Sequence, residues 1–172
     1  MSTQTETSAA ERARRIDALD LEPIKFKLMH TDDGAGWTLE RADAAEVEYK
    51  RFLVLNLKYP DHSNVPTHDV DTFWHYHILD TMKYAEDCEH VLGRFLHHFP
   101  YVGLQGEEDA LYLATAFEET QALYRAEFDV PVISGVAAQC DAGSHCAPPQ
   151  PCDGKGVQGR VRPRPLRPET VN

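Results

Sequence analysis

The sequence predicts an all-α protein, a compact bundle of about four to five helices followed by a disordered C-terminal tail. Two observations support this fold class. Apolar residues recur every three to four positions along several stretches, which is the helical period, and no pair of alternating stretches is available to form a sheet. The 172 residues, with 42% hydrophobic and 26% charged residues, also fit one globular domain with tails.

The first predicted elements are short. Residues 1–10 are small and polar, so we expect them to be disordered. The pattern of Glu11–Leu19 predicts a helix with Ile16 and Leu19 on one side. The segment Ile24–Met29 alternates weakly between apolar and polar residues and predicts an extended strap, which alone forms no sheet.

A long helix is predicted over Leu39–Leu57. Thr38 is a suitable N-cap residue because its hydroxyl can accept a hydrogen bond from the first turn. Tyr59-Pro60 ends the helix, since proline disfavours helical backbone at the residue before it. The face predicted to enter the core consists of Ala42, Ala45, Tyr49, Phe52, Leu53 and Asn56.

The next helix begins at Thr67 or Asp69 and runs through Ile78. It contains two aromatic residues, Phe73 and Trp74, at adjacent positions. Aromatic side chains of this size bury more apolar area than any others, so we expect both in the core rather than in a cofactor site.

Two further helices complete the predicted bundle. Asp80 is a suitable N-cap for a new helix that runs to Val91, and Gly93 ends this helix. The last helix covers Glu107–Phe128, where three acids in the first turn suit the positive end of the helix dipole. Its predicted apolar stripe consists of Leu111, Ala114, Phe117, Thr120, Leu123 and Tyr124.

The predicted helical domain spans residues 11–135, and residues 136–172 are predicted to be a disordered tail. Residues 140–172 carry a net charge of +2, so residues 1–139 carry −13. The same stretch holds six of the eleven prolines, three of the four cysteines and no aromatic residue. Such a segment cannot bury enough apolar surface to offset the entropy lost on ordering.

Charge and hydropathy exclude several classes of protein. A formal charge of −11 argues against a protein that coats nucleic acid or an anionic membrane. No apolar run approaches the ~20 residues of a membrane span, and the first residues do not form a secretory signal. We therefore expect a cytoplasmic protein whose cysteines are thiols or metal ligands rather than a disulfide framework.

Histidines are concentrated in one segment that also holds aspartates. Seven of the nine lie within 37 residues, namely His62, His68, His75, His77, His90, His97 and His98. Asp71 and His75 stand four residues apart on one helix face, an arrangement in which two side chains can hold one ion. His97 or His98, after a turn at Gly93, is the most economical third ligand. Imidazole with carboxylate suits iron, copper or zinc.

His77 does not fit this group on a regular helix. It lies two residues after His75, so the two side chains point about 200° apart. They converge only where the helix unwinds, and a cap at Asp80 is compatible with unwinding nearby. The alternative interpretation is that the histidines are hydrogen-bonded core residues around Trp74.

The same segment carries a resemblance to a known family. The matching elements are Asp69-x-Asp71-x-x-Trp74-His75-x-His77, Tyr84-x-x-Asp87-Cys88, Gly93 and His97-His98. They resemble the bacterial glycine-rich domain-containing protein-like family and, more distantly, the plant glycine-rich domain proteins. The likeness extends from about Ile16 to Phe128. It implies that Asp71, His75, His77 and His97 or His98 belong to the family pattern, and it implies no particular activity.

Two functions follow as hypotheses. In the first, the domain is a metal-dependent enzyme, an oxidoreductase rather than a hydrolase, that acts on a small molecule or peptide. Its expected metal ligands are Asp71, His75, His97 and His98, and its expected catalytic and orienting residues are His77, Tyr84, Asp87 and Cys88. In the second, the domain is an interaction module or a metal-storage or metal-sensing protein, and the basic tail meets the partner.

Overall fold

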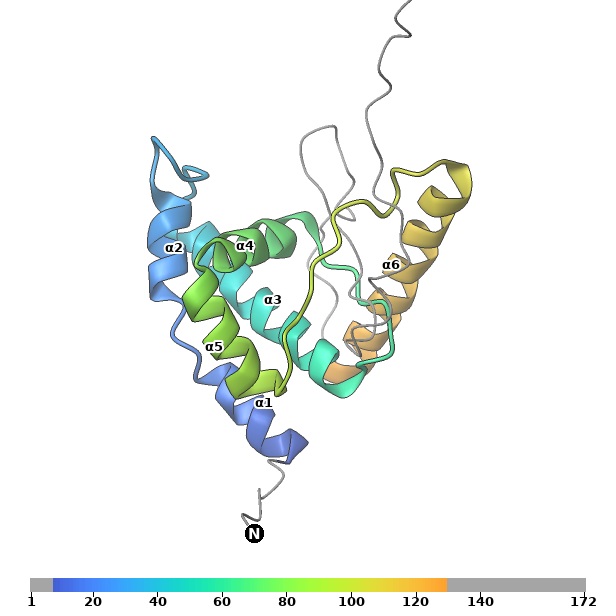
Figure 1. Cartoon of the computed structure of the whole chain (residues 1–172), viewed down its shortest axis with the longest axis horizontal. Helices are drawn as coiled ribbons and strands as arrows, with labels where there is room; N and C mark the ends of the chain where they lie inside the picture. Colours follow the sequence, from blue (N-terminus) through green and yellow to red (C-terminus); the bar gives the residue numbers. More distant parts are fainter. Residues whose placement is uncertain (1–7, 130–172) are drawn as a thin grey trace, which may run out of the picture.

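The computed structural model describes residues 8–129, which form six α-helices and contain no β-strand (Figure 1). The helices are α1 (Ala9–Asp17), α2 (Glu22–Met29), α3 (Leu39–Lys58), α4 (His68–Leu79), α5 (Thr81–Leu92) and α6 (Glu107–Phe128). The predicted all-α class is confirmed, with one helix more than expected. The predicted tail, residues 136–172, lies outside the described residues, as do residues 1–7. None of the described helices is long and apolar enough to cross a membrane.

α3 is the central helix of the bundle and packs against α1, α2 and α4. Thr38 caps it as predicted, because the hydroxyl accepts a hydrogen bond from the backbone N–H of Arg41 (3.3 Å). Every residue of the stripe predicted for this helix is buried. Tyr49, Phe52 and Leu53 lie in the main core beside Phe73 and Trp74 of α4.

The strap predicted over Ile24–Met29 is wrong, because these residues form helix α2. Pro23 stands in its first turn, where the missing N–H costs nothing. Ile24 and Leu28, four residues apart, are buried, whereas Phe26 is 74% exposed. Six residues are too few to distinguish a period of 2 from a period of 3.6, and the tertiary contacts decided the outcome.

α4 and α5 meet at a single residue. Asp80 is both the C-cap of α4 and the N-cap of α5, and its carboxylate accepts a hydrogen bond from the backbone N–H of Lys83 (3.3 Å). α5 ends as predicted at Gly93, which has φ +70°. Arg12 and Arg15 of α1 donate to the backbone carbonyls of Glu89 and His90 in its last turn, and the Glu89 carbonyl also accepts from the backbone N–H of Gly93 (3.0 Å). The corner between α4 and α5 is therefore a single residue, and α1 holds the opposite end of α5.

α6 stands apart from the five-helix bundle (Figure 1) and has a small core of its own. That core consists of Val65, Phe99, Val102, Leu113 and Ala116. The predicted stripe is wrong in the first half of the helix, where Leu111 is 69% exposed and Ala114 is exposed. This half is apolar on several sides. The pattern alone therefore did not reveal which side packs against the loop with Val65 and the loop with Phe99 and Val102.

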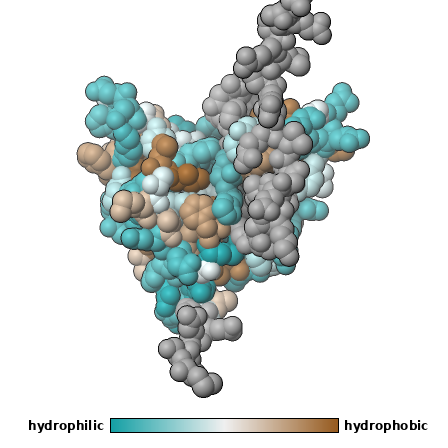
Figure 2. Space-filling view, viewed as in Figure 1, coloured by the Kyte–Doolittle hydropathy of each residue, from teal (hydrophilic) through white to brown (hydrophobic). Residues whose placement is uncertain are grey.

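The surface carries mostly hydrophilic side chains in the view of Figure 2, with hydrophobic groups scattered between them. The exposed large hydrophobic residues come from several elements, among them Phe26, Leu79, Met82 and Leu111. Single exposed hydrophobic residues are normal on a folded domain and identify no interface by themselves.

Candidate metal centre

Two segments bring together a carboxylate and two imidazoles. Asp71 and His75 stand one turn apart on α4, and His75 Nδ1 lies 3.1 Å from Asp71 Oδ2. His98 follows α5, and its Nε2 lies 3.3 Å from the other oxygen, Asp71 Oδ1. One ligand atom from each residue lies within 4.8 Å of the others. The spacing permits all three side chains to bind one ion.

The group is buried on one side and open on the other. Asp71 is 2% exposed and the His98 side chain 8%, whereas the side chain of His75 is 36% exposed. The imidazole rings of His75 and His98 are tilted by 57° to each other, with centroids 4.5 Å apart. A buried carboxylate needs paired partners, and these two imidazoles supply them. Solvent contacts the group at His75.

A hydrogen-bonded chain holds the segment that carries His98. Trp74 Nε1 donates to the Tyr84 hydroxyl (2.8 Å), and this hydroxyl donates to the backbone carbonyl of Leu96. The Trp74 ring also packs edge to face against His98, with centroids 4.6 Å apart. Arg94 provides a second anchor by donating to the carbonyl of Asn56 in α3 (2.7 Å). The position of His98 is therefore tied to α3, α4 and α5.

His77 lies in a second network. It is fully buried, with Nδ1 2.9 Å from the Tyr49 hydroxyl and Nε2 2.9 Å from Asp87 Oδ2. Burial raises the pKa of Tyr49 well above its usual range, so this hydroxyl keeps its proton and can donate it to Nδ1. Burial also raises the pKa of Asp87, but hydrogen bonds from His77 and Lys83 outweigh that effect and leave it lowered. Asp87 thus stays ionised and accepts from His77.

The structure separates the predicted site residues into three sets. Asp71, His75 and His98 form the group that can hold an ion. His97 is exposed, packs on the Phe95 ring and is not part of that group. The remaining predicted residues lie outside that group: His77 and Asp87 are bonded to each other, Tyr84 is bonded to Trp74, and Cys88 is a buried cysteine that forms no disulfide.

Two residues with a role in this arrangement were not predicted as site residues. Tyr49 was expected only as part of an apolar stripe, and Trp74 only as a core residue. Both have a polar atom that must find a partner when the ring is buried, which is the signal that sequence reasoning could have used. The pattern did not identify those partners, because Tyr49 and His77 are 28 residues apart.

Comparisons with known proteins agree with the family resemblance. A family model described as UCP032817-like matches residues 11–114, more than half of the chain. Glycine-rich domain-containing protein 1 of Arabidopsis thaliana is 28% identical over 130 residues, which cover 71% of this chain and 15% of the plant protein. No solved structure matches the chain significantly. The matched range includes the whole candidate centre, and the chain belongs to the UCP032817-like family.

Proposed function

We propose that the protein binds one transition-metal ion through Asp71, His75 and His98 and uses it as a metal-dependent enzyme. The observation that supports this most directly is the convergence of three ligand atoms within 4.8 Å from two separate segments. The types of ligand atom restrict the identity of the metal. Two imidazoles and one carboxylate are the set that non-haem iron(II) enzymes use, and zinc hydrolases use a closely similar set. Copper also accepts imidazole ligands.

Oxidation–reduction chemistry is the favoured class, ahead of hydrolysis. An ion with open coordination positions supplies activation of dioxygen or of water. The protein contributes two buried ligands, Asp71 and His98, and one ligand on the open side, His75. A small molecule or a peptide side chain would approach past His75. The compartment we propose is the cytoplasm, where the buried thiol of Cys88 stays reduced.

Tyr84 and Trp74 are positioning residues in this proposal. The Tyr84 hydroxyl bonds the indole N–H of Trp74 and the carbonyl of Leu96, two residues before His98. Partners of this kind typically change metal affinity 10–100-fold when they are removed. Cys88 lies one turn after Tyr84 on α5 and is buried with it.

We assign His77 to proton transfer with Asp87 rather than to metal binding. Both nitrogens of His77 are already hydrogen-bonded, one to Tyr49 and one to Asp87. To bind a metal, His77 would have to lose one of these buried hydrogen bonds, at a cost of about 1–3 kcal/mol. The imidazole joins the Tyr49 hydroxyl to the ionised Asp87 carboxylate through its two ring nitrogens.

The test is the metal content of the purified protein. We expect about one equivalent of metal per chain after reconstitution with iron(II), zinc or copper, and we expect Asp71→Ala/His75→Ala to lose it. His68→Ala/His90→Ala is the matched control, because both histidines are exposed and lie outside the group. Circular dichroism shows whether each variant folds, and Asp71→Asn serves where the double variant does not.

Three outcomes separate the functions. Wild-type protein that folds and binds none of the three metals would refute the site. Stoichiometric metal without dioxygen consumption or ester hydrolysis would favour storage or sensing over catalysis. Dioxygen consumption by the iron(II) form, absent from the zinc form and from Asp71→Asn, is the result expected for an oxidoreductase.

A further inference from the structure

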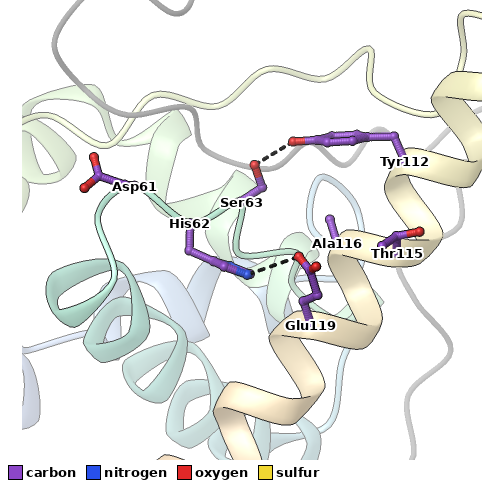
Figure 3. Close-up of a pocket in the computed structure, with 7 residues that line it drawn as sticks. All are labelled: Asp61, His62, Ser63, Tyr112, Thr115, Ala116 and Glu119. Carbon is purple, nitrogen blue, oxygen red and sulfur yellow. Dashed lines mark hydrogen bonds and ion pairs between the residues drawn. The ribbon is translucent and has the colours of Figure 1, made fainter.

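A pocket outside the metal centre lies between the loop before α4 and the first half of α6 (Figure 3). Its volume is about 290 Å³, and it is lined by Asp61, His62, Ser63, Tyr112, Thr115, Ala116 and Glu119. Two polar contacts join loop and helix: Ser63 Oγ lies 2.7 Å from the Tyr112 hydroxyl, and His62 Nε2 lies 3.4 Å from Glu119 Oε2.

The walls of this pocket are fixed independently of its charged residues. The hydroxyl of Thr120 on α6 accepts a hydrogen bond from the backbone N–H of Val65 (2.9 Å). Val65 itself is buried in the small core with Ala116. The Thr120–Val65 hydrogen bond and the small core therefore hold the loop and α6 together without the carboxylates of the pocket.

The lining is rich in hydrogen-bond acceptors and carries negative charge. Asp61 and Glu119 are both exposed carboxylates, and no lysine or arginine among residues 8–129 lines the pocket. When His62 donates from Nε2 to Glu119, its Nδ1 is left as an acceptor. This Nδ1 is buried and has no hydrogen-bond partner within residues 8–129. A guanidinium group, with five N–H donors and no acceptor, complements such a lining.

The chain itself supplies guanidinium groups of the required charge. α6 contains six acids and one basic residue. The chain continues from it into residues 130–172, beyond the described part, and this stretch includes Arg160, Arg162, Arg164 and Arg167. The region up to residue 139 carries −13 and the region from residue 140 carries +2. Opposite charges thus lie on one chain, on either side of the end of α6.

We propose that the pocket binds the arginine segment 160–167 of the same chain, with a guanidinium at the Glu119 carboxylate (Figure 3). Pro163 and Pro165 favour extended backbone around them, and alternate side chains of an extended chain lie on one side, ~7 Å apart. This inference is independent of the metal and of the proposed enzyme function.

The connecting chain is long enough for this contact. Glu119 lies ten residues before Asp129, which is ~15 Å along the helix. Arg160 lies 31 residues after Asp129, and 31 residues of chain can reach up to roughly 100 Å, which exceeds this distance. Attachment to the same chain gives the segment an effective concentration on the order of millimolar, so weak contacts suffice to fill the pocket.

Limited digestion with trypsin tests the contact in the full-length chain. Arg162, Arg164 and Arg167 each precede proline, a bond that trypsin resists, so Arg160–Val161 is the cleavable bond of the segment. We expect cleavage there to be several-fold faster in Asp61→Asn/Glu119→Gln than in wild type. Glu118→Gln is the matched control, an exposed neighbouring acid outside the pocket lining, and it should digest like wild type. Equal rates in all three proteins would overturn the proposal.

A synthetic peptide of residues 157–168 identifies the occupant. It should bind the full-length chain carrying Arg160→Gln, Arg162→Gln and Arg164→Gln, and bind wild type at least several-fold more weakly, because the attached segment competes. The same peptide with citrulline for arginine keeps the shape without the charge and should bind at least ten-fold more weakly. Equal affinity for both chains would overturn the intramolecular contact, and equal affinity of both peptides would overturn the role of charge.

Discussion

Asp71 Oδ1 and His98 Nε2 lie 3.3 Å apart although 27 residues of sequence separate them. This contact joins α4 to the segment after α5 at the candidate metal centre. His97, the neighbour of His98, is exposed and contacts the Phe95 ring instead. The two adjacent histidines therefore provide a direct comparison.

We expect His98→Ala to lower the affinity for zinc more than about 100-fold, since loss of a ligand exceeds the 10–100-fold effect of losing its support. His97→Ala should leave the affinity within about two-fold of wild type, because its ring is outside the group. Isothermal titration calorimetry with zinc alone measures both. Equal losses in the two variants would show that the site is not the one described.

Tyr84→Phe should destabilise the fold by about 1–3 kcal/mol, because the buried Trp74 N–H and Leu96 carbonyl both lose their hydroxyl partner. Urea unfolding measures this change. Tyr59→Phe is the control, since that hydroxyl is only half-buried and makes one long contact with Glu127 (3.3 Å). A metal affinity unchanged by Tyr84→Phe would remove its positioning role while leaving the ligand set intact.

The lowered pKa of Asp87 predicts a dependence of stability on acid pH. Its pKa in the folded protein lies below the unfolded value of ~3.9, so the unfolded state takes up its proton first as pH falls. The contribution is therefore fully present above that value and is lost as pH falls through the folded pKa. Urea unfolding of wild type and Asp87→Asn should differ at pH 6, and the difference should shrink towards pH 2.5. A constant difference would contradict the assignment.

Alanine at Gly93 tests the contact between Arg12 and the end of α5, and alanine at Gly36 is its control. Both have positive φ, +70° and +64°, so alanine at either position should cost about 1–2 kcal/mol in backbone strain. A Cβ at Gly93 would also meet the Arg12 guanidinium at 2.5 Å, whereas nothing lies near one at Gly36. Gly93→Ala should therefore lower the free energy of unfolding further, because Arg12 must leave the carbonyl of Glu89. Equal costs would show that the Arg12 contact contributes nothing.

The sequence predicted correctly those helices whose buried face coincides with the three-to-four-residue repeat of their apolar residues. The six-residue stripe of α3 is correct throughout, since this helix is covered along one continuous face. The stripe of α6 fails at Leu111, because its first half packs against loops whose course the sequence does not reveal. α2 fails for a related reason, since a six-residue run with four apolar residues fits both periods.

In the candidate site, too, helical spacing predicted some residue pairs, and contacts between distant segments determined the others. Asp71 and His75 could be paired from helical spacing alone. The choice between His97 and His98 could not be made, because both lie outside a helix and the Tyr84–Leu96 bond decides which one turns inward. The partners of His77 were also out of reach, since Tyr49 comes from a third helix.

The one-residue corner at Asp80 makes chain length there a strict requirement. Two hydrogen bonds cross it with the same ten-residue separation, Trp74 to Tyr84 and His77 to Asp87. One inserted residue would turn α5 by about 100° and remove both partners at once. The number of residues between Trp74 and Asp87 should therefore be the same in every homologue that keeps the centre.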